Sequence, residues 1–263
     1  MPKLKLEIQE IIVLYESGYS TTQIGEIAGV SSRYIRQLLT DKGVEKRPIG
    51  SWKRKYAFNE DYFKYWNNDM AYLLGFFIAD GYIASQSQSV AFTQKNPELL
   101  EEIKIIIGSN QPLYRNKHTG VYSLLFHSKV MKNDLQTVFH ITSDKSYNIT
   151  FPNIPNQYIH HFIRGYFDGD GHINYKGYTV SFVGASIAFM ESLKVLLLKY
   201  GFNPYMTDNG KHIRVFITGR KSIKQFGDWI YTDKSLYLKR KFAAFDQEKL
   251  SVDELQDRKR NRS

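Results

Sequence analysis

The chain has 263 residues, of which 42% are hydrophobic, 15% aromatic and 24% charged, and it contains no cysteine. These proportions indicate a globular protein with a sizeable core and exclude a wholly disordered, collagen-like or disulfide-rich chain, while the lack of cysteine leaves oxygen and imidazole groups as metal ligands. The formal net charge of +10 favours a polyanionic partner, nucleic acid above all, over a neutral small substrate.

Nothing in the sequence indicates secretion or membrane insertion. The first ten residues lack the uninterrupted apolar segment of a signal peptide, and no apolar run of about 18 residues occurs. We therefore expect no membrane partner and a location in the cytoplasm of a bacterial or phage-infected cell.

The first forty or so residues predict three short helices. Apolar residues at helical spacing predict a helix over 4–17 and a second helix that ends at Ala28. A turn at Gly29 then leads into a third helix that begins near Ser31. The stretch STTQIGEIAGVSSRYIRQLL resembles the helix-turn-helix of site-specific recombinases and many bacterial regulators, although a three-helix unit that only packs fits the pattern too. The predicted DNA contacts on the third helix are Ser32, Arg33, Arg36 and Gln37.

Residues 46–60 predict a basic linker. The stretch KRPIGSWKRK holds five bases and no acid, and its proline and glycine discourage a continuous helix. Such a tether suits contact with DNA phosphates or a minor groove through Lys53 and Arg54, and it suits a solvated spacer equally well.

A repeated nonamer follows, with LLGFFIADG at residues 73–81 and IRGYFDGDG at residues 163–171, ninety positions apart. The same spacing relates Phe92 to Phe182, and DKS triplets recur at nearly the same spacing. After each nonamer the pattern predicts alternating segments, a helix, further alternating segments and a shorter helix. The chain thus contains two copies of one α+β unit rather than a parallel βαβ fold.

The clearest strand alternation lies at residues 212–218. Ile213, Val215 and Ile217 can share one buried face, and Arg214 then projects from the other. A sheet with one wet, partly basic face suits groove binding, so Arg214 is a predicted DNA contact. Ordinary solvent exposure explains the same pattern without DNA.

Each nonamer carries a stripe of small residues. Gly75 and Ala79 are four residues apart in the first copy. Gly165 and Gly169 are four apart in the second, so the two helices can pack closely against each other in the interior.

Each nonamer also ends in Asp-Gly. We expect left-handed caps at Gly81 and Gly171. Asp80 and Asp170 then lie together at the same end of the helix pair. Two carboxylates within about 5 Å repel by roughly 3 kcal/mol at an effective dielectric constant of about 20, so folding alone does not favour this placement. A hard cation relieves the repulsion, and Mg²⁺ fits carboxylates and substrate phosphates better than zinc does.

Over roughly residues 60–245, these motifs resemble the signatures of single-chain LAGLIDADG homing endonucleases of the DOD type. The resemblance implies a pseudo-twofold duplicated αββαββα fold with saddle-shaped antiparallel sheets, in which the motif helices form the interface between the halves. It also implies a monomer that binds double-stranded DNA. Such an enzyme makes a site-specific double-strand break by phosphodiester hydrolysis and depends on Mg²⁺ or another hard divalent cation such as Mn²⁺.

The predicted domains follow from these motifs. They are a helix-turn-helix domain over 1–45, the linker over 46–60, an endonuclease domain over 61–247 with repeats at about 61–152 and 153–247, and a mobile tail over 248–263.

The resemblance assigns catalytic roles to five residues. Asp80 and Asp170 match the metal-binding acids, and Gln94 matches a polar strand-end residue that organises water near the metals. Lys145 and Lys234, in the DKS segments, match basic residues that flank the cleavage centre, and both also suit solvated surface charges.

The second copy departs from the first at two positions. Gly184 stands where repeat one has Gln94, so we expect the two half-sites to use unequal auxiliary groups. Ile78 replaces the first acid of the motif in copy one, whereas Asp168 keeps it in copy two. Further along, the stretch SLYLKRKFAAF predicts a last helix that places Lys239 and Lys241 beside DNA.

Two other functions fit the same scaffold. A sequence-specific regulator would bind DNA without cutting it, but regulators of that kind typically lack the acids and carry the reading module last. An intron RNA maturase would prefer a structured intron to a duplex.

Overall fold

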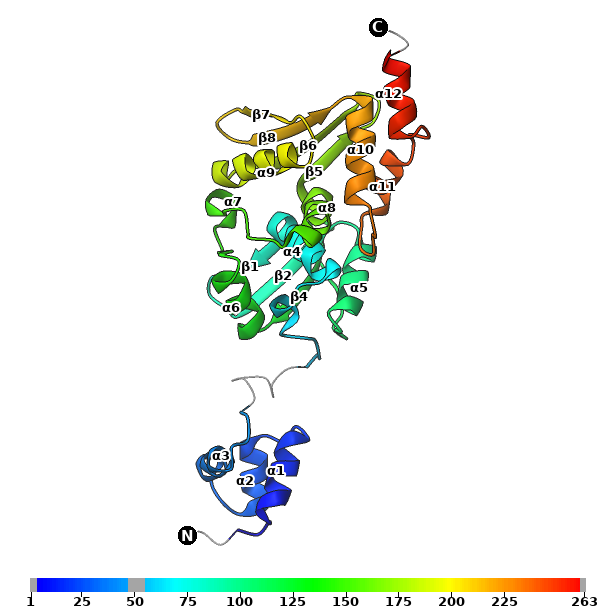
Figure 1. Cartoon of the computed structure of the whole chain (residues 1–263). Coiled ribbons are helices and arrows are strands. Elements are labelled where there is room, and N and C mark those ends of the chain that lie inside the picture. Colours follow the sequence, from blue (N-terminus) through cyan, green and yellow to red (C-terminus); the bar gives the residue numbers. More distant parts are fainter. Residues whose placement is uncertain (1–3, 47–54, 261–263) are drawn as a thin grey trace. The chain divides into compact units, whose positions relative to one another are not determined.

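The structure is a computed structural model that describes residues 4–46 and 55–260 (Figure 1). The chain divides into two compact units, residues 1–56 and residues 57–263. The predicted DNA contacts Lys53 and Arg54 lie outside the described residues. Within the described part of the chain, no helix has the length and apolar character needed to cross a membrane.

The first unit consists of three short helices around a small apolar core. These are α1 (Ile8–Glu16), α2 (Thr21–Ala28) and α3 (Ser32–Asp41). Serine side chains cap α2 and α3: Ser20 Oγ accepts from the main-chain N–H of Gln23 at 3.1 Å, and Ser31 Oγ accepts from that of Tyr34 at 3.2 Å. Gly29 ends α2 in the left-handed region, with φ at +72°, which a residue with a side chain rarely adopts.

The first helix is shorter than predicted. It begins at Ile8 rather than at residue 4, because the main chain before it is bonded elsewhere. The N–H of Lys5 donates to the carbonyl of Ala28 at 3.1 Å, so this segment lies against the end of α2 instead of continuing α1. Leu4 and Leu6 still pack on the small core.

The second unit contains two copies of the order αββαββα. The first copy is α4 (Asn68–Asp80), β1 (Gly81–Ile83), β2 (Ser89–Gln94), α5 (Pro97–Ile106), β3 (Tyr114–Arg115), β4 (Tyr122–His127) and α6 (Lys129–Thr137). The second is α8 (Ile159–Asp170), β5 (Gly171–Asn174), β6 (Thr179–Gly184), α9 (Ile187–Lys199), β7 (Tyr205–Asp208), β8 (Ile213–Thr218) and α10 (Arg220–Ile230). Outside the copies lie η2 (Tyr62–Lys64), α7 (Lys145–Asn148), η3 (Asn156–Tyr158), α11 (Lys239–Phe245) and α12 (Val252–Arg260).

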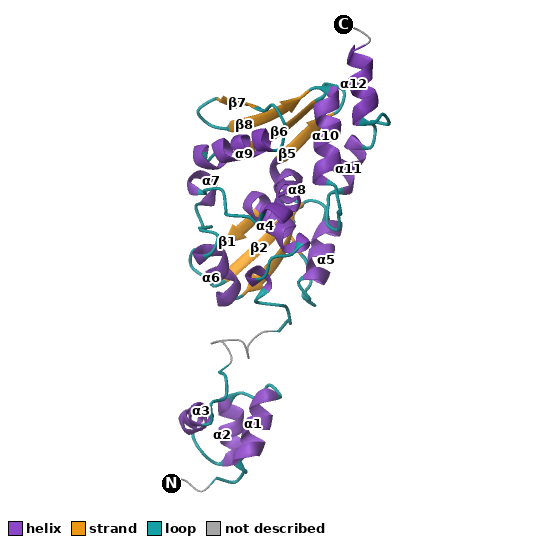
Figure 2. Cartoon of the chain, viewed as in Figure 1, coloured by secondary structure: helices purple, strands orange, loops and turns teal. Residues whose placement is uncertain are grey.

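Each copy forms one antiparallel four-stranded sheet with the same topology. The strand orders are β1-β2-β4-β3 and β5-β6-β8-β7. The registers correspond as well, since Gly81 pairs with Phe92 in one sheet and Gly171 with Phe182 in the other. Figure 2 shows the two sheets on either side of the α4 and α8 pair. The predicted fold class, a duplicated α+β unit, is confirmed.

The helices α4 and α8 pack main chain against main chain. A Cβ placed on Gly75 would lie 2.1 Å from the carbonyl oxygen of Phe162, and one on Gly165 would lie 2.0 Å from that of Tyr72. Neither position can hold a methyl group unless the helices move apart. The small-residue stripes of the two nonamers therefore set the distance between the copies.

The aromatic core repeats with the same symmetry. The rings of Phe77 and Phe92 meet edge to face at 5.2 Å, and their counterparts Phe167 and Phe182 do so at 5.6 Å. Each motif helix thus buries one side on its partner helix and another on its own sheet. This double burial covers the middle of each motif helix and leaves its C-terminal acid half-buried.

The glycines after the two acids do not adopt the predicted left-handed caps. Gly81 has φ −85° and ψ 160°, and Gly171 has φ −89° and ψ 157°, so both already belong to extended strands. Space requires glycine here instead. A Cβ at Gly171 would lie 2.1 Å from the ring of Phe167, and one at Gly81 would lie 2.3 Å from the carbonyl oxygen of Phe77.

Residues 248–260 are not part of the mobile tail that their composition predicts. Helix α12 lies along α10, and Leu255 is buried. Glu248 is buried too, where it accepts two hydrogen bonds from the guanidinium of Arg220 and one from the hydroxyl of Tyr175. An apolar side chain and a paired carboxylate are enough to order this polar stretch.

Candidate active site

Asp80 and Asp170 end the helices α4 and α8 side by side. Both are half-buried. A Cβ placed on Gly169, the residue before Asp170, would lie 3.5 Å from the Asp80 carboxyl carbon. The close helix pair therefore brings together two carboxylates that are ninety positions apart in the chain.

Burial and mutual repulsion disfavour the charged forms of these acids. Burial and the negative charge of Asp80 raise the pKa of Asp170 to about 6, although Lys145 and Lys241 oppose the shift. Burial also raises the pKa of Asp80, and Lys241, Lys145 and Arg240 oppose that shift. The five groups form one cluster of charges at the end of the helix pair.

The two acids have unequal neighbours. The side-chain amide of Gln94 donates to Asp80 Oδ2 at 3.0 Å, and the hydroxyl of Thr93 donates to the Asp80 carbonyl at 2.7 Å. Gly184 occupies the position of Gln94 in the second sheet and has no side chain to offer. Within residues 4–46 and 55–260, no group donates a hydrogen bond to the Asp170 carboxylate.

Two buried lysines hold the ends of the motif helices. The ammonium of Lys145 donates to the carbonyls of Ile78 and Ala79 at the end of α4. The ammonium of Lys241 donates to the carbonyls of Phe167, Asp168 and Gly171 at the end of α8. Burial lowers the pKa of each lysine to about 8, against the pull of the nearby carboxylates. A positive charge at a helix C-terminus also stabilises the helix, because it lies next to the negative end of the helix dipole.

The residue of the second copy that is equivalent to Lys145 is therefore Lys241 and not Lys234. The ammonium of Lys234 lies 4.6 Å from the ring centroid of Phe242 and 5.7 Å from that of Tyr237, on an exposed loop before α11. The spacing of the DKS triplets pointed to Lys234, but the second copy carries a longer segment before its lysine. Lys241 is also only 4% exposed, so its predicted position as a surface contact to DNA is wrong.

Asp168, the extra acid of the second nonamer, belongs to a separate hydrogen-bond network, although the charge of Lys241 acts on it as well. It is fully buried and accepts from the hydroxyl of Tyr72 and the main-chain N–H of Leu238, both at 2.8 Å. The guanidinium of Arg164 is buried in the same region and donates to the carbonyls of Leu236 and Ile230. This network joins the second copy to the first and to the chain before α11.

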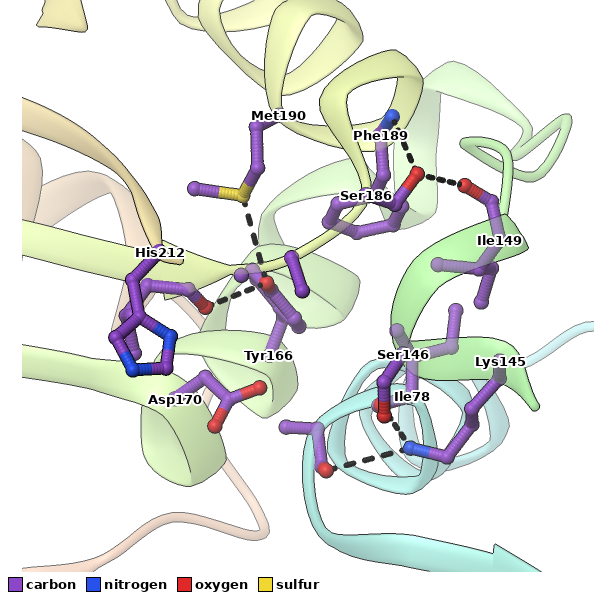
Figure 3. Close-up of a pocket in the computed structure, with 14 residues that line it drawn as sticks. Ile78, Lys145, Ser146, Ile149, Tyr166, Asp170, Ser186, Phe189, Met190 and His212 are labelled. Carbon is purple, nitrogen blue, oxygen red and sulfur yellow. Dashed lines mark hydrogen bonds between the residues drawn. The ribbon is translucent and has the colours of Figure 1, made fainter. Parts of the chain in front are cut away.

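A cavity of about 280 Å³ opens beside Asp170 (Figure 3). It is lined by Ile78 and Ala79 from the first copy, by Lys145 of α7, and by residues of the second copy that include Tyr166, Ser186 and His212. The figure shows the exposed His212 on the same side of the cavity as Asp170, with its imidazole extending toward that residue. Sequence reasoning did not assign a role to His212, because its strand alternation marks it only as an outward-facing residue.

The predicted DNA-contacting residues lie on two separate surfaces. On α3, Arg33, Arg36 and Gln37 are exposed, and the Gln37 amide donates to Asp41 at 2.8 Å. Ser32, at the start of α3, is half-buried.

On the second unit, Arg214 projects from the exposed face of the second sheet, while Ile213, Val215 and Ile217 are buried as the alternation predicts. Lys239 is exposed and forms ion pairs with Glu98 at 3.2 Å and Glu102 at 3.9 Å, both on α5 of the first copy. Part of its charge is thus already balanced within the protein.

The family model of the LAGLIDADG-like domain matches this chain twice, over residues 67–138 and 157–230. The chain belongs to the LAGLIDADG family. The two matches coincide with the two copies seen in the fold, and the motif helices α4 and α8 lie within them. The resemblance carried by the two nonamers is confirmed.

Solved structures agree with the LAGLIDADG fold. The homing endonuclease I-WcaI, solved bound to its DNA recognition sequence, is 17% identical, and the match covers 78% of this chain and 96% of that one with a TM-score of 0.51. Full-length WhiA from Thermatoga maritima is 16% identical over 72% of this chain and 63% of its own, with a TM-score of 0.46.

Curated relatives match over a limited part of their length. A probable translation initiation factor IF-2 of Methanocaldococcus jannaschii is 28% identical over 144 residues, which are 49% of this chain and 12% of that protein. A protein of the same name from Thermococcus kodakarensis is 27% identical over 59% of this chain and 14% of its own length. The matched segment is thus about an eighth of these relatives.

Proposed function

We propose that this LAGLIDADG protein is a site-specific DNA endonuclease that hydrolyses one phosphodiester bond in each strand of a duplex. The observation that carries the proposal is the pair Asp80 and Asp170, held together at the solvent-facing end of α4 and α8. Their mutual repulsion costs stability, which Lys145 and Lys241 offset in part and a bound cation would offset further. The solved relative I-WcaI, a homing endonuclease bound to its DNA recognition sequence, supports the proposal.

The donor set fits a hard divalent cation, Mg²⁺ or Mn²⁺. Asp80 and Asp170 supply carboxylate oxygens, which such cations prefer, and the Asp170 carboxylate accepts no hydrogen bond from the described residues. The two lysines act on the acids through their charge and not through hydrogen bonds, because their ammonium groups donate to main-chain carbonyls. When bound, the ion supplies Lewis-acid polarisation of the phosphate and a more acidic water.

The chain's own residues then have distinct tasks. Asp80 and Asp170 hold the ion, and Gln94 fixes the orientation of Asp80 through its 3.0 Å hydrogen bond. Lys145 and Lys241 place two positive charges behind the carboxylates, which offsets the negative charge of an incoming phosphate. In the reaction, the oxygen of a water forms a new bond to phosphorus, one P–O ester bond breaks, and the leaving oxygen takes a proton.

We infer that DNA recognition uses both units in one monomer. The exposed arginines of α3 have the position of groove-reading side chains in a helix-turn-helix, and a major groove admits such a helix. The exposed face of the second sheet offers Arg214 beside polar neighbours such as Thr207, its register partner. The net charge of +10 supplies the attraction for the backbone that both surfaces need.

A binding selection followed by a cleavage assay tests the proposal. The variant Asp80→Asn/Asp170→Asn keeps the fold's polar contacts and is used to select a duplex from a random-sequence pool. Wild-type protein with Mg²⁺ is expected to cut both strands of that duplex. The double variant should cut at least about a hundredfold more slowly while binding equally well.

The matched control is Asp228→Asn, an exposed acid paired with Lys224 on α10. It should leave cutting unchanged. Tight, sequence-specific binding without any metal-dependent cutting by the wild type would refute the nuclease and support the DNA-binding regulator. Preference for a structured RNA over every duplex would support the maturase.

A further inference from the structure

The two halves of the site surround their carboxylates with different side chains. In the first half, Gln94 at the end of β2 donates to Asp80. In the second half, the matching strand β6 ends at Gly184, which has no side chain to donate a hydrogen bond to Asp170. Some other group must take over if both carboxylates are to be held in a fixed orientation.

A side chain at residue 184 would require Met190 to move. A Cβ there would lie 2.8 Å from the sulfur of Met190 and 3.2 Å from the hydroxyl oxygen of Tyr166. Tyr166 stands where the first copy has Phe76, and its extra hydroxyl donates to the carbonyl of Val183 at 3.0 Å. The tyrosine and the glycine are thus a matched pair that leaves a cavity beside Asp170 in place of an amide.

His212 is the residue that faces this space from the neighbouring strand. Gly184 pairs in register with Ile213, the first residue of β8, so His212 comes directly before that pair. His212 and Asp170 both line the cavity, and the imidazole extends toward Asp170 on the same side of it (Figure 3). At about 280 Å³ the cavity has room for several waters, each of which occupies about 30 Å³ in the liquid.

We propose that His212 is the positioning residue of the Asp170 half-site and does there, through water in the cavity, what Gln94 does directly for Asp80. The inference rests on the proposed nuclease function. An imidazole N–H donates to a cavity water, that water donates to the Asp170 carboxylate, and the carboxylate keeps its orientation toward the ion. Outer partners of this kind typically alter metal affinity or activity by about 10- to 100-fold.

The consequence is that each DNA strand depends on a different side chain. His212→Ala is expected to slow cutting of one strand by about tenfold or more, and Gln94→Ala to slow cutting of the other. His212→Gln restores a side-chain donor and should bring the affected strand back to within about threefold of wild type. The measurement is a single-turnover assay on the selected duplex, with each strand labelled at its 5′ end by a different dye.

His118→Ala is the matched control, since His118 is an exposed histidine in the turn between β3 and β4. It should change neither rate. Equal slowing of both strands by His212→Ala, or no slowing of either, overturns the assignment while leaving the nuclease itself intact.

A spectroscopic test does not depend on cutting. In full-length protein with isotope-labelled histidines, substoichiometric Mn²⁺ should broaden the imidazole signal of His212 but not that of His118, and Asp170→Asn should abolish the effect. An unbroadened His212 signal contradicts the proposal. If the wild type cuts neither strand, the nuclease proposal fails. The broadening of the His212 signal then decides by itself whether His212 lies beside an ion bound at Asp170.

Discussion

Single side chains carry the asymmetry of this molecule. Ile78 and Asp168 occupy equivalent places on the two motif helices, yet one is apolar and the other accepts two hydrogen bonds. His161 belongs to the same polar region of the second copy. It is 1% exposed, and its Nδ1 has no hydrogen-bond partner among the described residues. A buried ring of this kind makes the fold sensitive to acid.

We predict that His161 destabilises the protein as the pH falls below about 6.5. Burial, with the charges of Arg164 and His160, lowers the pKa of His161 to about 3. The unfolded chain therefore binds a proton that the folded chain excludes. The free energy of unfolding should lose about 1.4 kcal/mol per pH unit from this ring as the pH falls from about 6.5 toward 3.

Comparison of variants isolates that contribution. Between pH 6.5 and 4.5, denaturant unfolding of His161→Phe should lose about 2 kcal/mol less than wild type does. His118→Phe, at an exposed ring, should follow the wild-type curve. Parallel curves for His161→Phe and wild type would show that the ring is charged in the fold. The raised pKa of Asp170 acts in the opposite direction, so the total slope of either protein alone does not answer the question.

At the scale of elements, the contact between α4 and α8 organises everything else. It fixes the spacing of the two sheets and places both acids at one end. Gly165 is the tightest point, with a Cβ expected 2.0 Å from the Tyr72 carbonyl oxygen. The sequence stripe of small residues is therefore a distance constraint on the site and not only a packing preference.

We predict that Gly165→Ala costs about 2–3 kcal/mol of stability even though alanine favours helices by about 1 kcal/mol. The added methyl can fit only if the helices separate. Ala188→Val adds bulk at an exposed position of α9 and should cost less than about 1 kcal/mol. Thermal or denaturant unfolding gives both values. A stabilised Gly165→Ala protein would mean that the helices are not in main-chain contact.

Local patterns predicted most of these elements because they depend on neighbours in the chain. The alternation at Ile213, Val215 and Ile217, and the repeat of the nonamers, follow directly from residue types. One error came where a distant contact decides. Lys241 replaced Lys234 because a loop of different length folds back on α8. At Gly81 the error is local, since the ring and carbonyl of Phe77, one helical turn earlier, require the glycine rather than its own dihedral angles.

For the whole molecule, charge would govern the proposed encounter with DNA. The chain carries 36 basic and 26 acidic residues, and several of the bases are already paired or buried. The free positive charge must therefore come from exposed side chains on the two units, Arg36 and Arg214 among them. Counterion release makes such binding depend steeply on salt.

We predict a slope steeper than about −5 when the logarithm of the binding constant is plotted against that of the salt concentration, which corresponds to about six phosphate contacts. Arg33→Ala/Arg36→Ala should weaken binding to the selected duplex. Lys249→Ala should not, because Lys249 is an exposed base paired with Asp246. Fluorescence anisotropy at several salt concentrations measures the slope, and a salt-independent affinity would contradict a phosphate-led interface.

The hydrogen bond from Tyr72 to Asp168 has a consequence for how such a chain can be divided. It joins positions that the pseudo-twofold axis does not exchange, since Phe162 stands in the second copy where Tyr72 stands in the first. Two identical second halves would bury each Asp168 against a phenyl ring, and two first halves would have no acid for either hydroxyl. The two halves are therefore complementary and not interchangeable. Either half expressed alone would form a homodimer that lacks this buried hydrogen bond.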